Sequence, residues 1–171
     1  WLSYNDLLRE PMAELIGAKP REVVLMNSLT VNLHLMMISF YRPGGRRNKI
    51  LIEQQSFPSD RYAVESQIRM HGLDPADCLV EIEPSDNGRT IDEKDIEEYL
   101  ASYGDQVALV LWPGVHYASG QFFDLDRIAK SAHSAGAFCG FDLAHAVGNV
   151  PLNLRENDVD FAVWCTYKFL N

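Results

Sequence analysis

The chain has 171 residues, of which 47% are apolar and 23% are charged, which is typical of one globular domain with a substantial core. Its formal net charge of −9, from 24 acidic and 15 basic residues, disfavours nucleic acid and anionic membranes as partners. Its apolar runs are too short to span a bilayer, and no signal peptide is recognisable. We therefore expect a cytoplasmic protein.

The three cysteines, Cys78, Cys139 and Cys165, are an odd number and form no CxxC pair. Two of them lie inside apolar stretches, where a thiol is usually a small core residue. This pattern fits a reducing compartment and argues against a structural zinc. We expect no metal site.

Helical and strand patterns alternate along the whole chain. In chain order, the predicted elements are a helix over residues 3–16, a strand over 23–26, a helix through 33–40, a strand over 49–53, a helix ending near 70, a strand over 79–82, a helix over 92–103, a strand over 107–112, a helix from 124 or 126 to 133, and strands within 138–146 and 161–168. Pro11 is expected to kink or divide the first helix. This alternation indicates a three-layer α/β/α sandwich with a mostly parallel sheet.

The last two predicted strands carry polar side chains only at their C-terminal ends. Asp142 and His145 follow the first of these strands, and Tyr167 and Lys168 end the second. The carboxyl ends of parallel strands meet at one edge of a sheet, where ligands bind. We therefore expect these four side chains to converge on one crevice.

A buried aspartate and a lysine on neighbouring strands suit pyridoxal phosphate (PLP) chemistry. Lysine supplies the amine for a Schiff base, and the carboxylate keeps the pyridine nitrogen protonated. An ordinary ion pair between Asp142 and Lys168 is the structural alternative. A metal site formed by Asp142, His145 and His116 is a further alternative, but it leaves Lys168 unexplained.

Two other segments supply candidate binding residues. Ser28 and Thr30 stand at the start of a predicted helix, where free N–H groups and the helix dipole favour an anion; simple N-capping is the alternative. Phe57 and Asp60 follow a predicted strand at the same sheet edge, although they also suit a core aromatic and a helix-start acid. GxGxxG, GxxxxGK[ST], GxSxG and HExxH motifs are absent from the sequence, so the enzyme classes that they mark lose their main support.

Four blocks of sequence closely resemble the kynureninase family of fold-type I PLP enzymes. The blocks are FDLAHAVGN at 141–149, WCTYKFLN at 164–171, LTVNLHL at 29–35 and FPSDRY at 57–62. Cysteine desulfurases share the aspartate and the lysine but not the Tyr-Lys-x-Leu-Asn ending. The resemblance covers nearly the whole chain and implies the fold of the PLP-binding large domain.

The resemblance also implies a role for individual residues. Lys168 would form the Schiff base and then move the Cα proton, Asp142 would pair with the pyridinium nitrogen, and Tyr167 would reach the phosphate and donate a proton. The implied cofactor-binding residues are Leu29, Thr30, Phe57, Ser59, Asp60, Asp142, Ala144, His145, Tyr167 and Lys168. Among them, Phe57 and Ala144 would flank the cofactor ring, and Leu29 and Thr30 would receive its phosphate.

The implied reaction is hydrolysis of L-kynurenine, or of its 3-hydroxy form, to anthranilate (or 3-hydroxyanthranilate) and L-alanine, in tryptophan catabolism and NAD biosynthesis. The family pattern also implies a homodimer whose second subunit completes the site. Residues 1–171 would be only part of the large domain, without the small domain and its substrate-binding arginine. One departure from the family is Pro113, which stands where a hydroxyl residue is usual and which cannot donate a hydrogen bond.

Two alternatives to kynurenine hydrolysis stay open. Another fold-type I reaction, such as desulfuration or transamination, would use the same aspartate and lysine. A non-catalytic fragment with the fold but no turnover is the second alternative.

Overall fold

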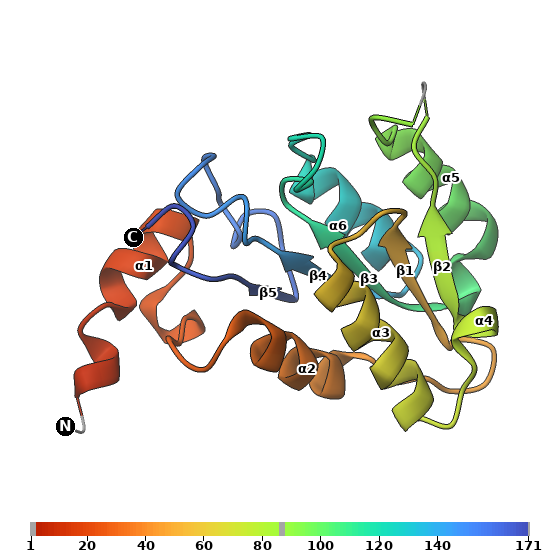
Figure 1. Cartoon of the computed structure of the whole chain (residues 1–171), viewed down its shortest axis with the longest axis horizontal. Helices are drawn as coiled ribbons and strands as arrows, with labels where there is room; N and C mark the ends of the chain where they lie inside the picture. The colour runs from red at the N-terminus through yellow and green to blue at the C-terminus, as the bar shows by residue number, and fades with distance from the viewer. Residues whose placement is uncertain (1–2, 86–87, 171) are drawn as a thin grey trace.

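The computed structural model describes residues 3–85 and 88–170, and it confirms the predicted three-layer α/β/α architecture (Figure 1). Trp1 and Asn171, the two ends of the predicted domain, lie outside the described residues. The strands are β1 (Lys49–Glu53), β2 (Leu79–Ile82), β3 (Val107–Pro113), β4 (Phe138–Asp142) and β5 (Phe161–Val163). All five are parallel to their neighbours, in the order β2-β1-β3-β4-β5.

Helices cover both faces of this sheet. The α-helices are α1 (Arg9–Ile16), α2 (Leu29–Phe40), α3 (Pro58–Met70), α4 (Pro75–Cys78), α5 (Glu93–Tyr103) and α6 (Leu125–Ser134), and the 3-10 helices are η1 (Tyr4–Asp6), η2 (Pro20–Glu22) and η3 (Gly104–Gln106). In the part of the chain that the structure describes, no helix has the length and apolar character needed to cross a bilayer.

The alternating sides of the central strands form two separate cores. Leu51, Val110 and Phe141 face the apolar stripes of α5 and α6, whereas Ile50 and Leu109 face α2 and α3. Strand β3 is buried along almost its whole length, as its continuous apolar run predicts for the centre of a parallel sheet. The two cores fix the sheet rigidly between its helical layers.

Strand order places a topological switch point between β1 and β3. The chain leaves β1 toward β2 on one side and later returns to β3 on the other side. In open α/β sheets, ligands bind beyond the carboxyl ends of the strands at such a point. Pro113 of β3 pairs in register with Asp142 of β4, so the predicted site residue Asp142 lies at this edge.

Three local predictions are wrong. Strand β5 ends at Val163, so Tyr167 and Lys168 lie beyond the strand rather than at its end. Residues 23–26 are not a strand: Val23 is extended, but no strand in the described chain pairs with this segment, which instead lines a cavity opposite β5. The first helical segment is divided before Pro11 rather than by it, because α1 begins at Arg9. Pro11 therefore lies in the first turn of α1, where a missing N–H breaks no intrahelical bond.

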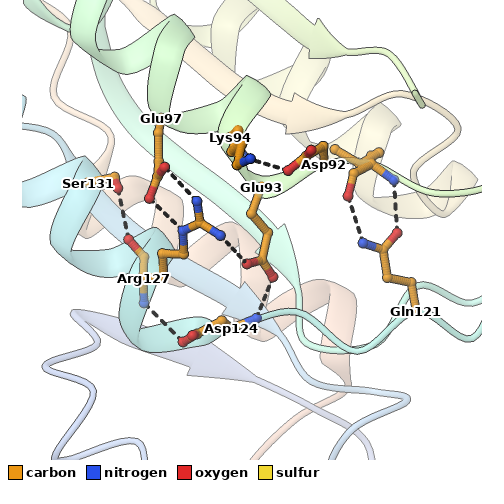
Figure 2. Close-up of polar contacts among 9 residues, drawn as sticks. Asp92, Glu93, Lys94, Glu97, Gln121, Asp124, Arg127 and Ser131 are labelled. Atoms are coloured by element: carbon orange, nitrogen blue, oxygen red, sulfur yellow. Dashed lines mark hydrogen bonds and ion pairs between the residues drawn. The ribbon is translucent and has the colours of Figure 1, made fainter. Parts of the chain in front are cut away.

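An ion-pair network joins α5 to α6 on the far side of the sheet from α2 and α3 (Figure 2). The guanidinium of Arg127 donates to both carboxylate oxygens of Glu97 at 2.6 and 2.7 Å, and to Glu93 at 3.3 Å. Asp124 caps α6 by accepting a hydrogen bond from the backbone N–H of Arg127. The bidentate geometry makes this pair stronger than most surface ion pairs.

Candidate active site

The amine of Lys168 lies between an imidazole and an aromatic ring. Its Nζ atom is 2.8 Å from Nε2 of His145 and 5.4 Å from the centre of the Phe57 ring. Burial lowers the pKa of His145, and the positive charge of Lys168 lowers it further. His145 is therefore neutral at pH 7 and accepts a hydrogen bond from the amine.

A pair of carboxyl groups lies at the same edge. Asp142 ends β4 and accepts a 2.7 Å hydrogen bond from the backbone N–H of Ala144, while Asp60 stands in the first turn of α3 beside the hydroxyl of Ser59. Burial raises the pKa of Asp60 to about 8, with a further contribution from a hydrogen bond to Asp142. At neutral pH Asp60 is therefore mostly protonated.

A third acid, Glu53, was missed in the sequence. It ends β1, and only 5% of its surface is exposed. Burial raises the pKa of Glu53 well above its ordinary value, and the negative charges of Asp60 and Asp142 raise it further. Among the described residues, no lysine or arginine forms an ion pair with any of these three acids. The raised pKa values of Asp60 and Glu53 lower the negative charge that these acids carry at neutral pH.

The start of α2 opens into a cavity of about 890 Å³. Leu29, Thr30, Thr166 and Tyr167 are among the residues that line it. Ser28 makes no side-chain hydrogen bond to the helix end, so the N-capping alternative is not observed. The first N–H groups of this 12-residue helix are left for an anion.

The ten predicted binding residues fall into two adjoining groups. Around the amine and the carboxyl pair lie Phe57, Ser59, Asp60, Asp142, Ala144, His145 and Lys168. The cavity at the start of α2 is lined by Leu29, Thr30 and Tyr167, and Tyr167 joins the two groups because it precedes Lys168.

Two contacts differ from simple expectation. Within the described part of the chain, Asp142 and Lys168 form no direct ion pair; the amine is hydrogen-bonded to His145 instead. The side chain of Tyr167 is 76% exposed, and its hydroxyl is hydrogen-bonded to Cys165, which raises the pKa of Tyr167.

Two aromatic residues near the amine were also missed in the sequence. The Tyr117 ring lies 5.2 Å from the Phe57 ring and 6.5 Å from the His145 ring, and Phe169 lies 6.1 Å from His145. The only sequence feature that pointed to Tyr117 is its position in the loop after a predicted strand, at the edge of the sheet where ligands bind. His116, the metal-site alternative, has its Nδ1 atom 3.0 Å from the hydroxyl of Ser119, and residues 3–85 and 88–170 contain no metal-ligand cluster.

The chemistry of these groups fits PLP. Lys168 offers an amine, and Asp142 at the end of β4 offers a carboxyl group that can pair with a pyridine nitrogen. The exposed face of Phe57 offers a stacking surface for the ring. The unpaired N–H groups at the start of α2 suit the phosphate.

Known proteins resemble the chain in sequence and in fold. The family model described as "Aminotransferase class-V" matches residues 5–171. Kynureninases of Xanthomonas euvesicatoria and Stenotrophomonas maltophilia are each 57% identical over the whole chain, which spans 40% of their length. A cysteine desulfurase from Thermococcus onnurineus is 25% identical, with a TM-score of 0.79 over 96% of this chain and 39% of its own.

A cysteine desulfurase from Escherichia coli has the same fold, with a TM-score of 0.77 over 98% of this chain, 41% of its own chain and 20% sequence identity. The match to the family model extends over almost the entire sequence and includes every residue of the candidate site. The chain belongs to the aminotransferase class-V family of PLP-dependent enzymes.

Proposed function

We propose that the natural polypeptide containing this chain is a kynureninase. It would hydrolyse L-kynurenine or 3-hydroxy-L-kynurenine to anthranilate or 3-hydroxyanthranilate and L-alanine. The observation that carries this proposal is the 57% identity to kynureninases along all 171 residues. The cysteine desulfurase from Thermococcus onnurineus has the same fold but only 25% identity, so the identities favour kynurenine hydrolysis over desulfuration as the reaction.

Bound PLP would act as an electron sink for the carbanions that the cleavage generates. Lys168 would hold the cofactor and carry the proton of the substrate Cα. Its contact with His145 supports this role, because a neutral imidazole that accepts a hydrogen bond orients the amine. Tyr167, which neighbours Lys168 and lies at the rim of the cavity, would donate a proton in a different step.

Asp142 would hold the pyridine nitrogen in its protonated form. The raised pKa of Asp60 supports this role, because a protonated Asp60 can donate a hydrogen bond to the Asp142 carboxyl group. Leu29 and Thr30 would bind the phosphate at the start of α2, while Phe57 and Ala144 would flank the ring. Pro113, at the end of β3, would donate no hydrogen bond to the phosphate. The start of α2 and Tyr167 would therefore bind the phosphate.

The chain spans 40% of the length of the curated relatives that it matches. We propose that residues 1–171 form part of the PLP-binding large domain, and that the rest of the natural polypeptide supplies the substrate-carboxylate site. We also propose a cytoplasmic homodimer in which the second subunit completes the site. The three free cysteines support a reducing compartment.

The test is product release by the longest natural form of the protein, loaded with PLP. Kynureninase activity predicts equimolar anthranilate and alanine from L-kynurenine, followed by fluorescence and amino-acid analysis. Sulfide from cysteine, or a keto acid from an amino donor, would assign a different reaction of the same fold. No product from any of these substrates would support a non-catalytic protein.

A further inference from the structure

The loop that follows β3 places the partly exposed ring of Tyr117 beside the candidate active site. Tyr117 is 41% exposed, and its ring stands almost perpendicular to that of Phe57, at 84° and 5.2 Å. The ring of His145 lies 6.5 Å away on another side. Because His145 contacts the amine of Lys168, Tyr117 stands one side chain away from that amine.

Backbone and side-chain contacts hold this loop rigidly. The N–H of His116 donates to the carbonyl of Gln121 at 2.9 Å, and the N–H of Gly120 donates back to the carbonyl of His116 at 2.9 Å. A Cβ atom at Gly114 would lie 2.5 Å from Leu143 and 2.8 Å from Ala146, so the loop starts in close contact with the segment that carries His145. The position of Tyr117 is therefore fixed before any ligand binds.

Two further contacts tie the loop to its neighbours. The buried His116 side chain bonds to Ser119 and to the backbone of Gln55, two residues before Phe57. The side-chain amide of Gln121 bonds to both backbone groups of Ile91, at 2.9 and 2.7 Å (Figure 2). The relation between the Tyr117 and Phe57 rings is therefore set by the fold rather than by chance contact at a surface.

We propose that Tyr117 is a specificity-determining residue whose ring packs against the aryl group of the substrate. This inference rests on the proposed function. The substrate of a kynureninase carries a large flat aryl ketone beyond the atoms that react. An exposed aromatic face, rigidly held beside the amine, binds such a group through apolar burial and ring-ring contact.

The test compares two variants of the full-length, PLP-loaded protein. Tyr117→Leu keeps an apolar side chain but removes the ring, so KM for L-kynurenine and Kd for anthranilate should both rise about three- to tenfold. Tyr117→Phe retains the ring and should stay within about twofold of the wild type in both constants. The value of kcat should change less than KM, because the ring touches no reacting atom.

Tyr103→Leu is the matched control, because Tyr103 is an exposed tyrosine at the end of α5 whose ring packs on Tyr99. It should leave both constants unchanged. If Tyr117→Leu leaves them unchanged too, the inference is wrong. A loss in Tyr117→Phe as large as in Tyr117→Leu would assign the effect to the hydroxyl and would also overturn it. If the wild type released no anthranilate, the proposed function itself would fail, which is a separate result.

Discussion

Lys168 donates a hydrogen bond from its amine to Nε2 of His145 across 2.8 Å, and this contact joins the segments that follow the neighbouring strands β4 and β5. The sequence separates the two residues by 23 positions. Burial and the charge of Lys168 both keep His145 neutral, so the imidazole acts as an acceptor. The amine is therefore held in one orientation before cofactor binds.

Replacing His145 by glutamine should remove an acid limb from the pH profile of PLP attachment. The pKa of His145 is lowered, so the imidazole is neutral and accepts from Lys168 at neutral pH. As the pH falls through this lowered pKa, His145 gains a proton and the hydrogen bond is lost. Attachment rates measured by stopped-flow absorbance should fall at acid pH more steeply for the wild type than for His145→Gln. His71→Gln, at the exposed end of α3, should keep the wild-type profile.

Replacing Asp142 should weaken PLP binding. Hydrogen bonds to charged groups contribute about 1.5–3 kcal/mol, so Asp142→Ala should lower the affinity for PLP by about 10- to 100-fold. Asp142→Asn keeps the acceptor for the N–H of Ala144 and isolates the loss of charge. Equilibrium dialysis gives both constants. Asp126→Asn, in the first turn of α6, is the control. Equal affinity of Asp142→Ala and the control would argue against the assigned role.

Asp60→Asn should make the stability of the protein less dependent on pH. The pKa of Asp60 is raised to about 8 by burial and by Asp142, so its stabilising contribution is full below about pH 4 and is lost as the pH rises through 8. The Tm of the wild type should therefore fall relative to Asp60→Asn between pH 5 and pH 9. Since about 2–4 °C corresponds to 1 kcal/mol at this size, the relative change should be several degrees.

Glu53→Gln provides the companion measurement for Asp60. The pKa of Glu53 is also raised, so its ionisation also lowers the Tm as the pH rises. The Tm of the double variant should therefore depend less on pH than the Tm of either single variant. Parallel Tm curves for the wild type and Asp60→Asn would show that Asp60 ionises as an ordinary surface carboxyl group.

Gly140→Ala should destabilise the sheet. A methyl group at Gly140 would overlap the ring of Phe161 on the neighbouring strand, because Gly140 pairs with Phe161 in register. Overpacking of this kind costs about 1–3 kcal/mol, which urea unfolding would detect as a lower midpoint with an unchanged m-value. Gly44→Ala is the control, since nothing lies within 4 Å of the added methyl group. Equal midpoints for the two variants would contradict the close packing of β4 on β5.

The sequence was sufficient to predict the layers and the edge at which the site lies. Apolar runs that end in polar residues identify β4 and the region after β5, because a parallel sheet turns sequence order into a common edge. The prediction from the sequence failed for residues 23–26, where the local pattern favours a strand but no neighbouring strand in the described chain supplies the hydrogen bonds. Strand formation needs a partner, and a partner is not a local property.

The composition of the site was harder to predict. Glu53 reads as the polar end of a strand, and only its burial beside Asp60 and Asp142 distinguishes it from a solvated acid. Tyr117 lacks any periodic signal, since its position depends on the contacts of His116 and Gln121. The role of His145 as partner of Lys168 also required the register of β4 and β5.

The most direct measurement is borohydride reduction of the longest natural form of the protein after purification with PLP, followed by peptide mapping. We expect a single phosphopyridoxyl group, on Lys168, and its complete loss in Lys168→Ala protein that remains folded by circular dichroism. The exposed Lys130, paired with Asp126, should stay unmodified and serves as an internal control. A reduced adduct on another lysine, or an adduct that persists in Lys168→Ala, would contradict the assignment of this edge as the PLP site.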